Sequence, residues 1–226
     1  MKRILVTGAT GQVGSAVIAA LRAVEGINVR AAVRDVARAT RIWNGEPNVH
    51  PVEFDFLDRA TQNAALAGCD SLFLLRPPQL NSDFGGLITP ARQHGVTHIV
   101  FLSVQGAERN PFIPHHKIER RLMSCGVPFT LLRPAYFMQN FTSTLQDELV
   151  RRYCIFLPAG KARFTLVDVG DIARVAVMLL LHLLPRLKAT PLVKHTVADL
   201  TGRVPTEFAQ FVAAHCDELL TPPARP

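Results

Sequence analysis

Residues 4–14 of the chain read Ile-Leu-Val-Thr-Gly-Ala-Thr-Gly-Gln-Val-Gly, and this stretch decides the fold. It begins in a short apolar segment typical of a buried strand and leads into a segment, Gln12–Val24, whose apolar residues recur at helical spacing. The glycines between have separate uses: Gly8 permits a tight turn, Gly11 lets a pyrophosphate approach the backbone, and Gly14 lets the helix pack closely on the strand. The stretch therefore predicts a phosphate-binding turn at the start of a helix.

Segments typical of strands and helices alternate through the first two thirds of the chain, the pattern of a parallel sheet with helices on both faces. The expected strands are Arg3–Thr7, Asn28–Val33, Val49–Phe54, Ser71–Leu75, Thr97–Ser103 and Phe129–Leu132. The expected helices are Gln12–Val24, Ala60–Ala67, Ile88–His94 and Lys117–Cys125. The sequence thus predicts an α/β fold of Rossmann type, a doubly wound parallel sheet, with a dinucleotide-binding core over residues 1–134.

The alternation is less regular beyond residue 134, where we expect a small, shortened substrate lobe over residues 135–226 that also holds elements completing the core. Its expected elements are a loop and helix at Tyr136–Val150, a strand at Phe164–Val167, a helix at Asp171–Leu184 capped by Asp171, a strand at His195–Asp199 and a helix at Thr206–His215. The longest apolar stretch, 172–184, is far below the roughly 20 residues that cross a bilayer. We therefore expect no membrane span.

The residue at the end of the second strand should select the cofactor. An acid at this place binds the ribose 2′-hydroxyl of NAD, whereas an arginine accepts the 2′-phosphate of NADP. The sequence reads Ala-Val-Arg-Asp at 32–35, so Arg34 predicts NADP(H), with Arg38 one helical turn further on. Asp35 leaves NAD open as the alternative, and an arginine in a loop can also be an ordinary solvated residue.

Phe54-Asp55-Phe56 closes the third strand. The Asp55 carboxylate can accept a hydrogen bond from the adenine amino group, and the ring edge of Phe56 can cover the base. An equally simple interpretation is that this segment caps the helix that follows it.

Composition limits the class of protein. Of the 226 residues, 48% are hydrophobic, enough for one compact domain with a sizeable core. The formal net charge is +7, but the basic residues are scattered without interleaved aromatics, so an anionic cofactor accounts for the surplus and nucleic-acid binding is not expected. The cysteines form no CxxC pair and the histidines no metal-ligand spacing, so no metal is expected. Because no export signal is visible, we expect a cytoplasmic protein.

Five segments together resemble the NmrA-like branch of the atypical short-chain dehydrogenase/reductases. They are ILVTGATGQVG (4–14), AAVRD (31–35), FLSVQGAE (101–108), HHKIERRLMSCGVPFTLLRPAYFMQN (115–140) and FTLVDVGDIARVA (164–176), in the order of the family. The resemblance implies a Rossmann core with NADPH or NADP⁺ as ligand. Several members reduce quinones, azo compounds or triphenylmethane dyes, and others resemble enzymes in shape yet act as cofactor-sensing regulators.

The resemblance also implies roles by position. The residues that would contact the diphosphate are Gly8, Thr10, Gly11, Gln12, Val13 and Gly14. Arg34 would contact the 2′-phosphate, and Leu75 and Arg76 would border the adenosine and its ribose. Ser103 stands in the place of the superfamily's active-site serine, and Lys117 in the place of the lysine that binds the nicotinamide ribose. The nicotinamide and substrate pocket would be lined by Pro134, Tyr136, Phe137 and Asn140.

Several of these residues also have plainer interpretations. Ser103 is equally well explained as a strand-end cap, Lys117 lies in a basic stretch that can be a solvated helix face, and the aromatic pair at 136–137 can be packing residues. His115 and His116 could move protons near neutral pH, but the sequence places no carboxylate partner beside them.

Two departures from the family pattern bear on function. The superfamily's Tyr-x-x-x-Lys motif places its tyrosine where this chain has Ile113, so the usual phenolic proton donor is absent and alcohol dehydrogenation is not expected. The chain is also some tens of residues shorter than family members, which predicts a shallow pocket. A quinone needs less help, because its ring stabilises the product oxyanion. We therefore expect an NADPH-dependent reductase that transfers hydride to a quinone-like or other planar electrophile. The alternative is a non-catalytic NADP(H)-sensing regulator with a protein partner.

Overall fold

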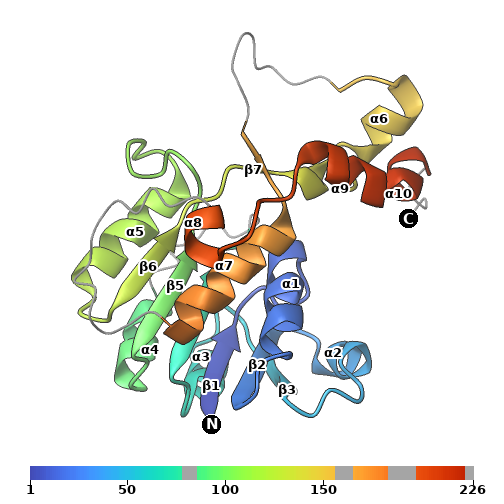
Figure 1. Ribbon diagram of the computed structural model, residues 1–226. Helices are drawn as coiled ribbons and strands as arrows, with labels where there is room; N and C mark the ends of the chain where they lie inside the picture. Colours follow the sequence, from blue (N-terminus) through green and yellow to red (C-terminus); the bar gives the residue numbers. More distant parts are fainter. Residues whose placement is uncertain (78–85, 156–164, 183–196, 222–226) are drawn as a thin grey trace.

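The computed structural model describes residues 1–77, 86–155, 165–182 and 197–221, which form the layered α/β structure in Figure 1. Six parallel strands make one sheet in the order β3-β2-β1-β4-β5-β6. Their bounds are β1 Lys2–Val6, β2 Ile27–Val33, β3 Val49–Glu53, β4 Ser71–Leu75, β5 His98–Leu102 and β6 Phe129–Leu132. The order reverses between β1 and β4, as in a Rossmann fold. The predicted doubly wound parallel sheet is therefore confirmed.

Burial explains why these segments are strands. All five residues of β5 are buried, as are the first four of β4. Strands covered on both faces are continuous apolar runs rather than alternating ones. Within β1 the two faces still separate, because Ile4 and Val6 join one hydrophobic cluster and Leu5 joins the other. The sheet is thus the middle layer of three.

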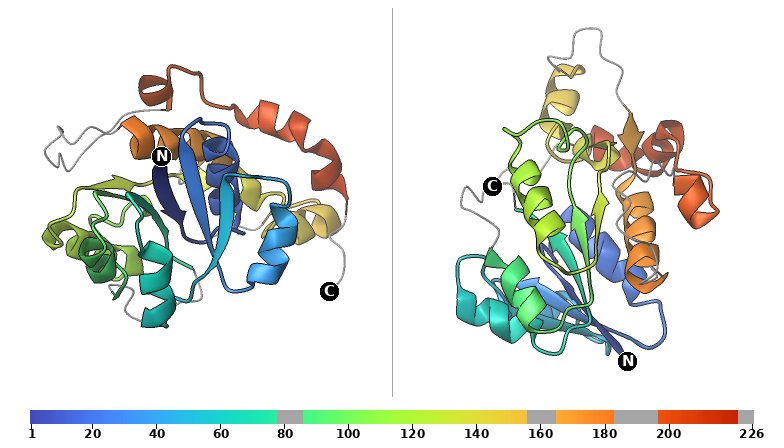
Figure 2. Two further views of the ribbon diagram at one scale, coloured as in Figure 1. Left: turned by 90° about the horizontal axis from the view of Figure 1, so that it is seen from below. Right: turned by 90° about the vertical axis from the view of Figure 1, so that its left-hand side faces the viewer.

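Helices cover both faces of the sheet (Figure 2). One face packs against α1 (Gln12–Leu21) and α7 (Val169–His182), which contact each other and share one hydrophobic cluster. Three helices pack on the other face: α3 Arg59–Leu66, α4 Ile88–Gln93 and α5 Pro114–Ser124. Because α7 lies far along the sequence from α1, a late segment of the chain completes the core of the amino-terminal half.

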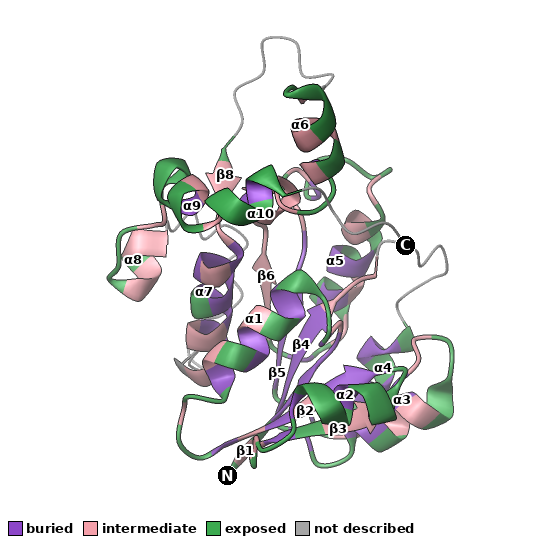
Figure 3. Cartoon of the chain, turned by 90° about the vertical axis from the view of Figure 1, so that its right-hand side faces the viewer, coloured by how far each residue is buried: buried purple, intermediate pink, exposed green. Residues whose placement is uncertain are grey.

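A group of smaller elements lies beyond the carboxyl ends of the strands (Figures 1 and 3). They are β7 Tyr136–Phe137, the 3-10 helix η2 Met138–Asn140, α6 Gln146–Arg152, β8 Leu166–Val167, α9 Phe208–Ala214 and α10 Cys216–Leu220. β7 and β8 pair in parallel as a separate two-stranded sheet. The Gln146 side chain donates to the backbone oxygens of Glu218 at 2.5 Å and Thr221 at 3.2 Å. This contact joins α6 to the last described residues.

The prediction that Asp171 caps a helix is wrong. α7 begins at Val169, and the Asp168 carboxylate accepts the N–H of Gly170 at 2.7 Å. Asp171 instead is the third residue of the helix, within its first turn, and is 2% exposed. Its carboxylate accepts from the Arg174 side chain at 2.5 Å and from the N–H of Thr206 at 2.7 Å. A buried carboxylate needs such partners, so Asp171 joins α7 to the segment before α9.

The expected strand at His195–Asp199 is also wrong where the structure describes it, because Val197–Thr201 is a helix, α8. Val197 and Leu200 pack against the cluster that contains α7, and this tertiary contact outweighs the β-branched composition. Two further helices were not expected: α2 Val36–Ile42 and α10 Cys216–Leu220. The expectations for Phe164 and for residues 183–196 lie outside the described residues.

The longest helix in the described part of the chain, α7, has 14 residues. No helix in that part is long and apolar enough to cross a membrane.

Candidate functional site

The glycine turn lies where the strand order reverses, at the carboxyl end of β1. Gly8 has a φ of +60°, in the left-handed region that glycine adopts without strain. The N–H of Gly11 donates to the Gly8 oxygen at 3.0 Å, and Gly11 is the N-cap of α1. No side chain caps this end of α1, and Thr10 and Gln12 beside it are exposed. The first N–H groups of the helix are therefore available to an anion.

Gly14 sets how closely α1 packs on the turn. A Cβ built at this residue would lie 2.1 Å from the Gly8 oxygen and 2.7 Å from the Gly8 carbonyl carbon. Both are backbone atoms, so no side-chain rotation could relieve the clash. A Cβ at Gly11 would meet only the Gly8 oxygen, at 3.3 Å. The two glycines therefore serve different ends: Gly14 is required by packing within the protein, whereas Gly11 leaves its outer side free. Val13, between them, is buried in the core cluster.

Thr7 and Leu75 fix the other side of the turn. The Thr7 hydroxyl accepts the N–H of Leu75 at 2.8 Å and lies 3.2 Å from the Phe73 oxygen, to which it can donate. The Leu75 side chain packs on the turn, since its Cδ2 atom would lie 3.0 Å from a Cβ at Gly8. These contacts join the carboxyl ends of β1 and β4. Leu75 and Arg76 thus lie at the switch point, and their contact with adenosine stays a prediction.

The ends of β2 and β3 place the residues that were expected to meet the adenosine. Arg34 follows β2 and is exposed. The Asp35 carboxylate is already in use, because it accepts the N–H of Arg38 at 2.8 Å and caps α2. A carboxylate engaged in this way is a poor partner for a ribose hydroxyl, so the local structure favours Arg34 and a 2′-phosphate.

After β3, Asp55 and Phe56 form a compact turn. The Asp55 carboxylate accepts the N–H of Leu57 at 2.8 Å, and the Phe56 ring meets that of Phe54 edge to face at 4.7 Å. The cap of α3 is Asp58, which accepts the N–H of Ala60 at 2.8 Å. Asp55 therefore orders the turn before the helix cap.

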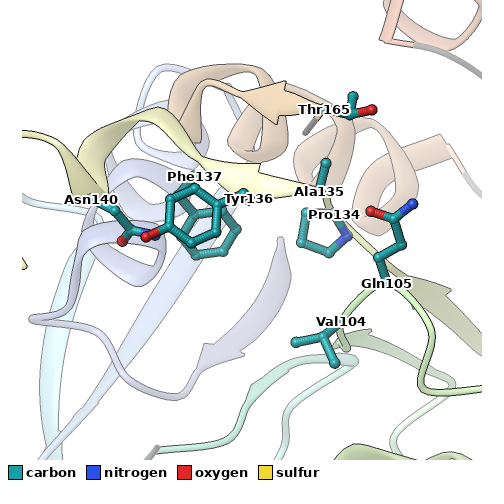
Figure 4. A pocket seen from close by; sticks show the side chains of 8 residues that line it. All are labelled: Val104, Gln105, Pro134, Ala135, Tyr136, Phe137, Asn140 and Thr165. Carbon is teal, nitrogen blue, oxygen red and sulfur yellow. The ribbon is translucent and has the colours of Figure 1, made fainter. Parts of the chain in front are cut away.

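A hollow of about 510 Å³ lies beyond the carboxyl ends of β5 and β6 (Figure 4). Its lining comes from the segment after β5, from the segment after β6 through β7 to η2, and from the residue before β8: Val104, Gln105, Pro134, Ala135, Tyr136, Phe137, Asn140 and Thr165. The structure thus brings together the four residues expected to line a substrate pocket. Figure 4 shows the aromatic rings and Asn140 on one side and Val104 and Gln105 on the other.

Ser103 and Lys117 are not among the lining residues. Ser103 is 1% exposed, and its hydroxyl donates to the carboxylate of Glu119 at 2.5 Å. Lys117 is exposed on α5. His115 is half-buried and stacks on Phe101 with ring centroids 5.8 Å apart. Burial, followed by the positive charge of Arg76, lowers the pKa of His115, so this ring is neutral near pH 7. The described geometry leaves the roles of Ser103 and Lys117 as predictions.

Hydrogen bonds connect the glycine turn to the hollow. The Gln12 side chain donates to the Ser143 hydroxyl at 3.0 Å, and that hydroxyl donates to the Gln139 backbone oxygen at 2.8 Å. The Gln139 side chain in turn donates to Asp168 at 2.7 Å and accepts the N–H of Val169 at 2.9 Å. The segment around Asn140 is therefore tied both to the start of α1 and to the start of α7.

These features fit a dinucleotide. The glycine turn leaves the first N–H groups of α1 uncapped, as a diphosphate would require. Arg34 lies after β2, on one side of the turn, and the hollow lies beyond β5 and β6, on the other side, at the same edge of the sheet. The model of the NmrA-like family matches residues 1–203. The chain belongs to the NmrA-like family. The predicted family membership is therefore confirmed.

Named relatives of this NmrA-like chain are longer than it is. Prestalk A differentiation protein A of Dictyostelium discoideum is 32% identical over 182 residues, which cover 79% of this chain and 59% of that protein. NAD(P)H azoreductase of Xenophilus azovorans is 30% identical over 183 residues, covering 78% of this chain and 63% of that protein. The crystal structure of NADPH-dependent quinone oxidoreductase QOR2 from Escherichia coli, complexed with NADPH, matches with a TM-score of 0.70 and 25% identity over 80% of this chain and 65% of that one. The chain thus spans about three fifths of the curated relatives' length.

Two residues of the NmrA-like site went unnoticed in the sequence. Glu119 is 1% exposed and Arg133 is half-buried, and the two form a pair with N–O distances of 2.8 Å. The available signal was the place of Glu119 beside apolar Ile118 and Leu122 on α5, where a charged residue would be buried. Among the described residues, no group of three or more His, Cys, Asp or Glu side chains could hold a metal ion.

Proposed function

We propose that this protein is an NADPH-dependent reductase that transfers hydride to a quinone-like or other planar electrophile. The observation that carries the proposal is the connection of the glycine turn to an aromatic-lined hollow through Gln12 and Ser143. In a Rossmann sheet a dinucleotide lies across the carboxyl ends of the strands, at the switch point. The matched azoreductase and quinone oxidoreductase support the same reaction class.

The chain's own residues would bind the cofactor and orient it against the acceptor. The turn at Gly8–Gly14 would hold the diphosphate, Arg34 the 2′-phosphate, and Lys117 the nicotinamide ribose. Asp55 and Phe56 would border the adenine. NADPH, when bound, supplies the hydride. Tyr136, Phe137 and Asn140 would hold a flat acceptor in the hollow and exclude water from its face.

The choice of a quinone-like acceptor rests on proton donors. Ile113 occupies the position of the superfamily's tyrosine, and the Ser103 hydroxyl donates its hydrogen to Glu119. Neither position therefore offers a proton to an acceptor oxygen. An acceptor whose reduced anion is stabilised by its own ring needs such a donor least. A quinone meets this requirement, whereas a simple ketone does not.

The lack of a proton donor at Ile113 and Ser103 also favours a second candidate function, a non-catalytic NADP(H) sensor that changes its binding to a protein partner. Catalytic turnover distinguishes the reductase from the sensor. NADPH oxidation would be followed by absorbance with a panel of quinones and, for comparison, simple ketones and aldehydes. Oxidation with quinones alone supports the proposal. Tight binding of NADPH without oxidation by any acceptor overturns it in favour of the sensor.

A further inference from the structure

Glu119 is a charged side chain inside the protein. It is 1% exposed, on the side of α5 that also buries Ile118 and Leu122. A carboxylate at such a place must have its lost hydration replaced by hydrogen bonds and opposite charge. Nothing in the reductase chemistry proposed above uses it directly, since it does not line the hollow.

Its partners satisfy it completely. Arg133 donates from Nε to Oε1 and from Nη2 to Oε2, both at 2.8 Å, which is the two-pronged geometry specific to arginine and carboxylate. The Ser103 hydroxyl donates to Oε1 at 2.5 Å. Burial alone would raise the pKa of Glu119, but the hydrogen bonds from Arg133 and Ser103 and the charge of Arg133 outweigh it and lower that pKa. Glu119 is therefore ionised near neutral pH. Arg133 also lies 3.6 Å from the Glu108 carboxylate.

The partners of Glu119 come from two neighbouring strand ends that lead into the hollow. Ser103 follows β5 and directly precedes Val104 and Gln105, which line the hollow. Arg133 follows β6 and directly precedes Pro134 and Ala135, which lie beside Gln105 and lead to the aromatic residues on the opposite side (Figure 4). Between the two strand ends the backbone contributes the bond from Ser103 N–H to the Leu132 oxygen at 2.8 Å and a longer one from Gln105 N–H to the Pro134 oxygen at 3.3 Å. Backbone pairing therefore weakens where the hollow begins.

We propose that Glu119 is a positioning residue that fixes these two strand ends against each other and so sets the width of the hollow in which a planar acceptor would fit. Stability alone does not explain the pair, because well-packed apolar residues of similar size commonly replace a buried ion pair without loss. The directional bonds of a carboxylate to two strand ends supply geometry that apolar packing does not. The proposal rests on the proposed function, since it assigns Glu119 to the site where the acceptor would bind.

The test separates positioning from stability by removing both charges together. E119L alone leaves Arg133 buried without its carboxylate and is expected to lower the unfolding temperature. E119L/R133M removes both charges and is expected to restore it. E46Q is the matched control, because Glu46 pairs with Arg22 on the surface, outside the hollow. For each protein the unfolding temperature, the NADPH dissociation constant, the acceptor affinity by calorimetry, and kcat and KM with a quinone are measured.

The expected result for E119L/R133M is a restored unfolding temperature and unchanged NADPH affinity, with acceptor affinity and kcat/KM lowered about tenfold, the scale of a small misplacement of reacting groups. E46Q should match the unaltered protein throughout. An apolar pair that restores acceptor affinity together with stability overturns the proposal.

If E119L/R133M does not fold, E119D and S103A replace it, with the double variant E119D/S103A. Losses of acceptor affinity that are less than additive show that Glu119 acts through Ser103, and additive losses overturn the proposal. If the unaltered protein does not oxidise NADPH with any of the acceptors tested, the proposed function is refuted instead. The acceptor affinities still decide the role of Glu119 in that case.

Discussion

Replacing Gly14 by alanine should damage the fold, whereas replacing Gly11 should damage only ligand binding. The added Cβ of G14A would lie 2.1 Å from the Gly8 oxygen, where ordinary contact begins at 3.4 Å, so the turn or the helix must shift by about 1 Å. Overpacking of this kind costs about 3 kcal/mol, and the higher helix propensity of alanine offsets about 1 kcal/mol of it. The net loss is about 2 kcal/mol, which lowers the unfolding temperature by roughly 4–8 °C for a chain of this size.

G11A is the matched control. Gly11 has a φ of −83°, which alanine adopts freely, and its Cβ would lie 3.3 Å from the nearest atom. The weaker N-cap costs a few tenths of a kcal/mol to about 1 kcal/mol, and the stiffer unfolded chain offsets a similar amount. Its unfolding temperature should therefore stay close to that of the unaltered protein, while a methyl group on the outer side of the turn obstructs the diphosphate.

Circular dichroism melts of both variants, with calorimetric titration of NADPH, measure the two effects. Equal unfolding temperatures for G14A and the unaltered protein would refute the packing argument. Undiminished NADPH affinity in G11A would refute the role assigned to the outer side of the turn.

Three other predictions concern single side chains. R34A should weaken NADPH binding about tenfold, the value of a charge-assisted contact, and leave NADH binding unchanged, with R41A on α2 as control; equal losses for both cofactors would contradict the assignment of Arg34. Burial lowers the pKa of His98 from 6.5 to about 4, so stability should be complete above pH 6.5 and fall as the pH drops toward 4. Between pH 7.5 and 5 the unaltered protein should lose about 2 kcal/mol more than H98L in urea unfolding; parallel losses would contradict that pKa. Y136F should raise the KM for a quinone up to about tenfold, the value of one hydrogen bond, whereas Y153F, at an 89% exposed residue, should not; equal values would place Tyr136 outside the acceptor site.

The sheet and its switch point could be predicted from the sequence because local and tertiary preferences agree there. β4 and β5 are continuous apolar runs between turns, and burial on both faces requires such runs. The glycine turn likewise follows from residues within one segment. For these elements a one-dimensional pattern contains most of the information, and the structure changed their bounds by only one or two residues.

The lobe depends on contacts between distant segments, and the sequence pattern was less informative there. Asp168 and Asp171 stand three residues apart, and either could cap α7 by local preference. The choice is made by Gln139, which binds Asp168, and by Thr206, which binds Asp171. α8 is a helix because Val197 reaches the core cluster, a contact invisible in local composition.

The candidate site shows the same division. Pro134, Tyr136, Phe137 and Asn140 gather at the hollow because they follow β6 closely in the chain. The pairing of Glu119 with Arg133 depends on how α5 docks on the ends of two strands, so the sequence alone gave no reason to connect them.

We propose that this NmrA-like chain binds NADPH in preference to NADH and uses it to reduce a planar acceptor. Calorimetric titration of the purified protein with each cofactor, followed in the same sample by addition of a quinone, measures both properties. We expect tighter binding of NADPH and its oxidation once quinone is present. Equal affinity for the two cofactors, or a tightly bound NADPH that no quinone oxidises, would contradict it.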